Sequence, residues 1–171
     1  MRRLLVALLL ALVAAGCSSD KPKVAPAGSG TTSSSTGAFV GALTPVSTPP
    51  GGAQVVVSAV RVGARDSFER VVFDFAAGVP GYSVKYVDKP IIADASGDEV
   101  SVSGNAAIEV RLESALAHDV APRTTGVGVV KEVVKSGDFE AVVHFAIGVA
   151  SKLPFHVSVT GNKLIVDIAH G

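Results

Sequence analysis

The sequence has little of the residue types on which disulfide-stabilised domains, metal sites and nucleic-acid binding depend. It contains one cysteine, one methionine and no tryptophan among 171 residues. A single cysteine excludes an internal disulfide and a site built from several thiolates. Basic and acidic residues both number 15, so the formal net charge is zero. Because nucleic acids and anionic lipid headgroups attract a basic surface, we expect neither as the main partner.

The one cysteine, Cys17, follows an apolar N-terminal stretch. Two arginines precede an uncharged run over residues 4–15, which is too short to cross a bilayer but suits the apolar region of a signal peptide. The run ends in Ala-Ala-Gly-Cys, which resembles a bacterial lipobox. That resemblance implies cleavage after residue 16, a diacylglycerol on Cys17, and a further acyl chain such as palmitate.

Two or more acyl chains hold a protein stably at a bilayer. The sequence therefore predicts a signal peptide over residues 1–16 and lipid attachment at Cys17, on the extracytoplasmic face of the cell membrane. The alternative is an ordinary secretory signal with a cleavage site of the A-x-A type nearby.

Residues 17–52 have the composition of a tether. Of the 35 residues from 18 to 52, 27 are Ser, Thr, Gly, Pro or Ala. Such a stretch cannot bury enough apolar surface to offset the entropy lost on ordering. We predict a mobile tether here, and docking of Phe39, Val40 and Leu43 on the following domain is the alternative.

From residue 53 to 171, apolar and polar residues alternate with a period of two. Turn residues such as Ser103-Gly104-Asn105 and Thr160-Gly161-Asn162 separate the alternating segments. Many short strands with one apolar face predict an all-β domain, an antiparallel β-sandwich. The clearest alternating sets are Val71/Phe73/Phe75, Tyr82/Val84/Tyr86, Ile108/Val110/Leu112, Phe155/Val157/Val159 and Leu164/Val166/Ile168.

The domain also contains a weak internal repeat. Phe68-Glu69 and the strand that follows are echoed by Phe139-Glu140, at an offset of 71 residues. Each copy then reaches a glycine, a proline and a strand that begins with an aromatic residue, Tyr82 or Phe155. We therefore predict two related halves that give two similar sheets facing each other.

The sequence offers no sign of catalysis. No histidine has a partner at the spacing of a metal ligand pair, no G-x-S-x-G turn is present, and the sole cysteine is the lipid site. A meeting of His144 with His156 across a sheet face is the one alternative to two solvated histidines. We predict no catalytic residue, no metal site and no cofactor, and hence no enzyme.

Five residues are candidates for ligand binding. Arg70 and Arg123 each carry a guanidinium group that can hold a carboxylate bidentately. Tyr82 and Tyr86 can pack their rings while the hydroxyl reaches the rim of the domain. His144 lies on the polar phase of its predicted strand.

Several motifs together resemble a known family. They are Phe68-Glu-Arg-Val-Val-Phe-Asp-Phe75, Pro80-Gly-Tyr-Ser-Val-Lys-Tyr-Val87, Gly137-Asp-Phe-Glu140, Ile147-Gly148, Leu153-Pro-Phe155 and Leu164-Ile-Val-Asp-Ile-Ala-His170. Over about residues 54–170 the chain resembles the AMIN-like domain of actinobacterial lipoproteins and secreted proteins. This family is related to the AMIN domain that accompanies N-acetylmuramoyl-L-alanine amidases and some secretins.

The resemblance implies a β-sandwich of two similar sheets that binds or localises to peptidoglycan, or another cell-wall polymer, without catalysis. The alternative is a lipoprotein that contacts an envelope protein, and so recruits or regulates a cell-wall enzyme or a transporter. The first hypothesis predicts a cell-wall polymer as the partner, and the second predicts a protein.

Overall fold

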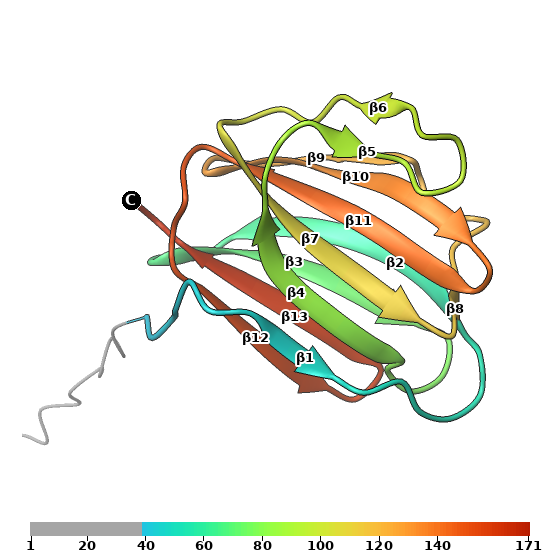
Figure 1. Cartoon of the computed structure of the whole chain (residues 1–171). Coiled ribbons are helices and arrows are strands. Elements are labelled where there is room, and N and C mark those ends of the chain that lie inside the picture. Colours follow the sequence, from blue (N-terminus) through green and yellow to red (C-terminus); the bar gives the residue numbers. More distant parts are fainter. Residues whose placement is uncertain (1–38) are drawn as a thin grey trace, which may run out of the picture. The chain divides into compact units, whose positions relative to one another are not determined.

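The computed structural model describes residues 39–171, which form an all-β unit (Figure 1). The predicted signal peptide, Cys17 and the tether up to residue 38 lie outside the described residues. No helix in the described part is long and apolar enough to cross a membrane. In chain order the strands are β1 (Val46–Thr48), β2 (Val55–Ala64), β3 (Phe68–Phe75), β4 (Gly81–Val87), β5 (Ile91–Ile92), β6 (Glu99–Val100), β7 (Ala106–Glu113), β8 (Ala115–Leu116), β9 (Arg123–Thr125), β10 (Val130–Phe139), β11 (Val142–Val149), β12 (Phe155–Thr160) and β13 (Lys163–Ala169).

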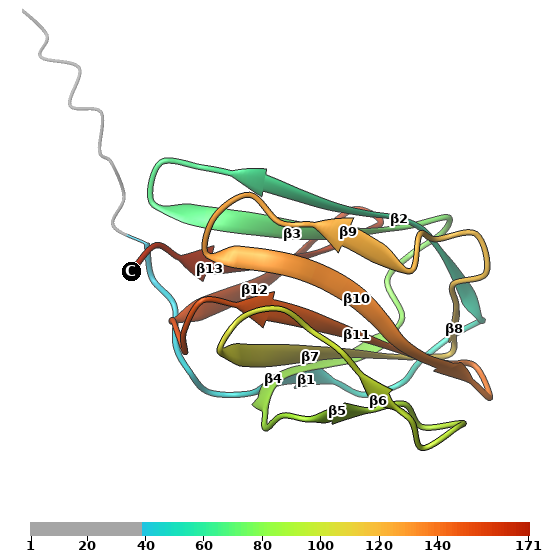
Figure 2. The same ribbon diagram turned by 90° about the horizontal axis from the view of Figure 1, so that it is seen from above.

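Two sheets face each other, which confirms the predicted β-sandwich (Figures 1 and 2). The six-stranded sheet runs in the order β1-β4-β7-β11-β10-β9, and the five-stranded sheet runs β12-β13-β3-β2-β8. All neighbours pair antiparallel except β2 and β8, which pair in parallel through two residues each. Loops must therefore carry the chain repeatedly from one sheet to the other.

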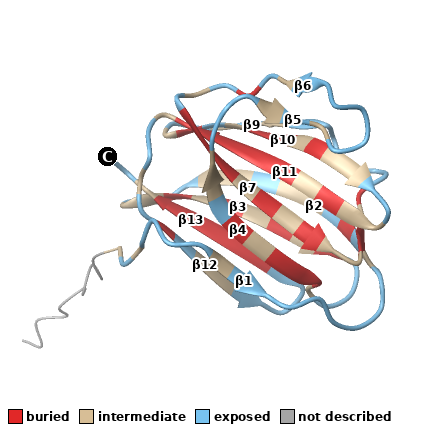
Figure 3. Cartoon of the chain, viewed as in Figure 1, coloured by how far each residue is buried: buried red, intermediate tan, exposed pale blue. Residues whose placement is uncertain are grey.

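The alternation in the sequence produces the core between the sheets (Figure 3). In β3, Val71, Phe73 and Phe75 are buried, whereas Arg70 and Asp74 on the other face are only partly covered. The rings of Phe73 from one sheet and Phe145 from the other lie 5.1 Å apart between their centroids. Because successive strand residues point to opposite faces, each strand supplies one apolar side to this core.

The strand order reveals the internal repeat. Without the short strands β1, β8 and β9, the two sheets have the strand orders β12-β13-β3-β2 and β4-β7-β11-β10. The first half of the domain contains β2, β3, β4 and β7, and the second half contains β10, β11, β12 and β13. If the strands of the two halves are exchanged in this order, the strand order of one sheet becomes that of the other. Each half thus gives two strands to each sheet, so the halves interlock rather than form one sheet apiece.

The residue equivalence differs by one position from the predicted offset. Val143 and Phe145 face the core as Val71 and Phe73 do, and they stand 72 positions later in the chain. The sequences match at an offset of 71 because β3 and β11 each contain two adjacent valines. Only one valine of each pair, Val71 or Val143, faces the core. Burial, rather than residue identity, therefore sets the structural alignment of the halves.

The sandwich begins earlier than the predicted boundary at residue 53. β1 pairs with β4, and Ala42 exchanges two backbone hydrogen bonds of 2.9 Å with Phe155. The Phe39 ring lies 5.5 Å from the Phe68 ring, between centroids. These segments occupy sheet edges that would otherwise leave polar backbone groups unpaired. Of the three residues in the docking alternative, Phe39 packs on the domain, whereas Val40 and Leu43 are exposed.

The two outer faces of the sandwich differ. The β5–β6 hairpin lies over the outside of the six-stranded sheet, where Ile91, Val100 and Val102 pack with Val134 and Ala146 (Figure 2). No such layer covers the outside of the five-stranded sheet within residues 39–171. The face of the five-stranded sheet is therefore the more open surface.

Candidate functional site

Charged side chains gather on the open face of the five-stranded sheet. The register places Asp74 of β3 beside Lys163 of β13, and Arg70 of β3 beside Asp167 of β13. Arg61 of β2 lies on the same face and reaches Asp74. All five follow the polar phase of strands whose other phase fills the core. The alternation that builds the sandwich thus also assembles this charged surface.

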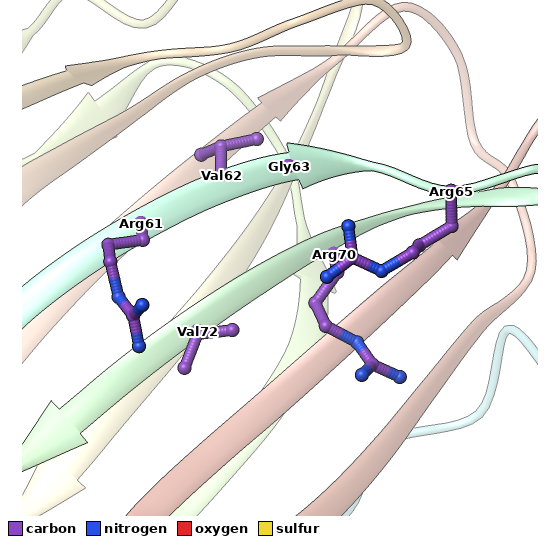
Figure 4. A pocket seen from close by; sticks show the side chains of 6 residues that line it. All are labelled: Arg61, Val62, Gly63, Arg65, Arg70 and Val72. Atoms are coloured by element: carbon purple, nitrogen blue, oxygen red, sulfur yellow. The ribbon is translucent and has the colours of Figure 1, made fainter.

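A shallow hollow lies at one end of this face (Figure 4). Its volume is about 200 Å³. Gly63 stands opposite Arg70 in the β2–β3 register, and a Cβ at Gly63 would lie 3.5 Å from Nη1 of Arg65. The missing side chain therefore leaves room between guanidinium groups. We call this site the arginine hollow; it is lined by Arg61, Val62, Gly63, Arg65, Arg70 and Val72.

Arg70 is held by a bidentate ion pair. Its Nε and Nη2 donate to the two carboxylate oxygens of Asp167 at 2.7 and 2.8 Å. The hydrogen bond that Arg70 donates to Asp167 raises the pKa of Arg70, against the opposing effect of burial. The Asp167 side chain is 7% exposed and that of Arg70 is 30% exposed. This pair fixes the plane of the Arg70 guanidinium. Nη1 of Arg70 donates no hydrogen bond within residues 39–171.

Arg61 is also paired with a carboxylate, but its side chain is more exposed than that of Arg70. Its Nε donates to Oδ2 of Asp74 at 2.8 Å, and Lys163 contacts the other carboxylate oxygen. Burial opposes ionisation of Asp74, but the hydrogen bonds from Lys163 and Arg61 outweigh it and lower the pKa of this carboxyl group. The Arg61 side chain is 60% exposed. Since Asp74 has two cationic partners, Arg61 can turn toward a ligand without leaving a carboxylate uncompensated.

Arg65 carries the uncompensated charge of the hollow. Its Nη1 donates to the carbonyl oxygen of Ala64 at 2.7 Å, and it has no carboxylate partner in the described part of the chain. Arg65 is exposed, and its side chain extends over the sheet toward Arg70 (Figure 4). A guanidinium fork with free donors suits a carboxylate or another planar anion. The hollow can therefore accept an anionic group from a ligand.

Of the two tyrosines proposed from the sequence, Tyr82 lies in the core and Tyr86 packs against it, partly buried. Tyr82 is 9% exposed. The Tyr86 hydroxyl donates a hydrogen bond to the carbonyl oxygen of Leu153 at 2.7 Å and accepts one from the N–H of Leu153 at 2.8 Å. Burial raises the pKa of Tyr86. Tyr86 thus ties β4 to the loop before β12, and its hydroxyl is already occupied.

Arg123 and His144 belong to the six-stranded sheet. Arg123 donates to Glu132 at 3.0 Å and to the carbonyl oxygen of Ser101 at 2.9 Å, which fastens the segment after β6. His144 lies between Asp94, 2.9 Å from Nε2, and Glu109, 3.4 Å from Nδ1. The hydrogen bond with His144 lowers the pKa of Glu109. Both candidates thus have protein partners that hold the β5–β6 hairpin region.

The structure does not bring the five sequence candidates together. Arg70 lies on the open face, Tyr82 in the core with Tyr86 at its margin, and Arg123 and His144 on the opposite sheet. Sequence reasoning missed Arg61 and Arg65. Arg61 could have been found from the sequence, because it alternates with Val60 and Val62 and must therefore point away from the core. His144 and His156 lie on different sheets, and no metal-binding cluster is present among the described residues.

Comparison with known proteins identifies the domain. No curated protein and no solved structure matches this chain. The family model of the AMIN-like domain matches residues 55–170, from the start of β2 to the end of β13 and one residue beyond. This match indicates a role related to peptidoglycan and outside the cytoplasm. The chain belongs to the AMIN-like domain family.

Proposed function

We propose that this protein is a lipid-anchored module of the cell envelope that binds peptidoglycan through the arginine hollow, without catalysing a reaction. The observation that carries the proposal is the uncompensated Arg65 beside Arg61 and Arg70 on an open sheet face. A family related to peptidoglycan supplies the ligand class.

The chemistry of peptidoglycan suits this surface. Its peptide stems carry carboxylates along an uncharged glycan, so an anionic group recurs at each stem. A carboxylate that enters the hollow can accept two parallel hydrogen bonds from Arg65 and a further one from Nη1 of Arg70. Arg61 supplies the second side of the hollow. Single contacts of this kind are weak, but copies anchored in one membrane and facing one polymer are linked, so they bind it with avidity.

The proposed anchor is the lipid on Cys17. Replacing Cys17 with alanine is expected to leave the chain uncleaved or soluble, because the acceptor for the diacylglycerol is removed. Intact mass and the distribution between membrane and soluble fractions measure this. Retention of the parental mass and of the membrane fraction by the Cys17→Ala chain would disprove lipid attachment there.

Peptidoglycan binding is tested by cosedimentation of the full chain, in mild detergent, with washed sacculi. The measurement is made with and without the secondary polymers of the wall. We expect sedimentation with both preparations, since the stem carboxylates are present in each. A chain that stays in the supernatant with both preparations refutes the proposed function, and binding that needs the secondary polymer reassigns the ligand.

A second candidate function is favoured by one observation. It is a lipoprotein that recruits or regulates a cell-wall enzyme or transporter through direct protein contact. The observation is the edge of β12 beyond Phe155, which has no paired strand in the described residues and offers a template for another chain. Crosslinking at the membrane to a defined protein, without retention on sacculi, is the result that this candidate expects.

A further inference from the structure

Most sheet edges of this sandwich are protected. β1 is three residues long and lies between Pro45 and Pro49, and β9, also of three residues, begins with Arg123. β2, which is paired with β8 only through Val55 and Val56, carries Arg61 and an irregular register between Val57 and Ala59. Short strands, flanking prolines, charges and bulges are the devices that prevent a sheet edge from pairing with another chain.

Beyond the flanking Pro154 and the bridge from Ala42 to Phe155, β12 has none of these devices. It is an edge strand of six residues, Phe-His-Val-Ser-Val-Thr, with no proline, lysine, arginine or carboxylate. Its register with β13 is regular from Phe155 to Thr160. Val159 is 47% exposed although it belongs to the apolar phase of the strand. Among the described edges, β12 is therefore the one prepared for a further strand.

The hydrogen-bonding groups of β12 that face outward can be assigned. Phe155 exchanges its N–H and C=O with Ala42, so these groups point away from β13. The direction of backbone groups alternates along an antiparallel ladder, so those of Val157 and Val159 point the same way. Neither valine has a backbone partner on that side within residues 39–171. The N–H and C=O groups of Val157 and Val159 are therefore free along this edge, next to the position of Ala42.

An apolar groove runs beside this edge. Its volume is about 240 Å³, and it lies between β12 and the segment that leads into β1. Val40, at one side, is 80% exposed. The lining residues are Val40, Gly41, Ala42, Thr44, Val46, Phe155, His156 and Val157. A strand added to β12 would place every second side chain on this apolar side.

The charges around the groove indicate the chemistry of the occupant. Residues 39–50 and 150–163, which form its walls and flanks, contain no aspartate or glutamate. They contain Lys152, His156 and Lys163, all of which are exposed. A second copy of the chain would bring like charges together, whereas an acidic segment complements them.

We propose that the edge of β12 binds an extended segment of a partner protein, which adds as an antiparallel strand beyond Ala42. The segment carries apolar residues opposite Val159 and Val157 and an acidic residue opposite His156. Its backbone completes the four free hydrogen bonds, and its apolar side chains enter the groove. The proposal does not rest on peptidoglycan binding, since the groove lies at the edge of the sheet and the arginine hollow on its outer face.

The test uses the full chain in mild detergent and a labelled peptide, acetyl-Thr-Val-Thr-Val-Glu-amide, in fluorescence anisotropy. In the proposed register its two valines face Val159 and Val157, and its glutamate faces His156. N-methylation of the two valines should weaken binding at least about tenfold, because it removes both N–H donors directed at β12. N-methylation of the two threonines is the matched control and should leave affinity within about twofold.

A variant of the chain gives the reciprocal test. Val159→Pro removes the outward N–H and keeps the ladder to β13, since proline is tolerated on the free side of an edge strand. We expect about five- to tenfold weaker peptide binding, unchanged binding to sacculi, and unchanged protection of the Ser158 and Ile165 amides from hydrogen exchange. Val159→Thr retains the N–H and is the control.

The proposal is overturned by no binding of the peptide at millimolar concentration, by equal binding of the peptide methylated on its valines, or by dimerisation of the parental chain that Val159→Pro abolishes. The last result would assign the edge to a second copy of the chain. Perturbed amide resonances outside β12 and residues 40–46 would also refute the assigned site.

Discussion

Replacing Arg70 with alanine is expected to lower the free energy of unfolding by about 2–4 kcal/mol. The reason is Asp167, which is 7% exposed and loses both of its charge-assisted hydrogen bonds. Removing one partner of a fully buried pair costs about 3–5 kcal/mol, and the partial exposure of Arg70 reduces that figure. Urea denaturation monitored by circular dichroism measures the change.

Arg61→Ala is the matched control for Arg70→Ala. Asp74 keeps Lys163 as a partner and Arg61 is 60% exposed, so the expected loss is below about 1 kcal/mol. The double substitution Arg70→Met with Asp167→Leu removes both charges and should recover stability close to that of the parental chain. Equal stability of Arg70→Ala and Arg61→Ala would show that the Arg70–Asp167 pair does not hold the sheet together.

Replacing Glu69 with alanine is expected to destabilise the fold by a similar amount, about 2–4 kcal/mol. Glu69 is 3% exposed, and its carboxylate accepts hydrogen bonds from the N–H groups of Val129 and Val130 at 2.9 and 2.8 Å. These bonds join β3 of one sheet to the start of β10 in the other. Each buried N–H left without an acceptor costs about 1–3 kcal/mol.

The repeat supplies the control for Glu69. Glu140 is its counterpart in the sequence, yet it lies exposed in the turn between β10 and β11. Glu140→Ala should therefore change the unfolding free energy by less than about 0.5 kcal/mol. A Cβ at Gly128 would overlap the Glu69 carboxylate, so Gly128→Ala should destabilise by the same route. A large effect of Glu140→Ala with little effect of Glu69→Ala would reverse this assignment.

The fold was predictable because its main signal is local. The period of two in segments such as Val71 to Phe75 reports which face of a strand is apolar, and that face becomes the core. The limits of the domain were harder to predict. β1 and Ala42 are held by backbone hydrogen bonds to β4 and β12, and such bonds leave no pattern in a segment rich in Ser, Thr and Pro. The contact between the rings of Phe39 and Phe68 likewise leaves no pattern in the sequence.

The candidate site was only partly predictable because it depends on register. Arg70 was identified as a residue able to hold a carboxylate, but its partner Asp167 stands 97 positions away and meets it only through the β13–β3 pairing. Arg65 gains its role because Gly63 leaves space beside it. Tyr86 has the amphipathic side chain of a rim residue, yet Leu153 takes up both hydrogen-bonding functions of its hydroxyl. Tertiary partners, rather than residue type, decide which polar groups remain free.

The most direct measurement is the affinity of the full chain for washed sacculi, compared between the parental protein and the variant Arg61→Ala/Arg65→Ala. These substitutions spare the Arg70–Asp167 pair, so the fold remains intact. Arg111→Ala on the opposite sheet is the control, since it removes a cation from the other outer face. Our account predicts that the parental chain and Arg111→Ala bind equally, and that the double variant binds at least about tenfold more weakly, the loss expected from two charge-assisted contacts. Equal binding by all three proteins would contradict a role for the arginine hollow in holding peptidoglycan.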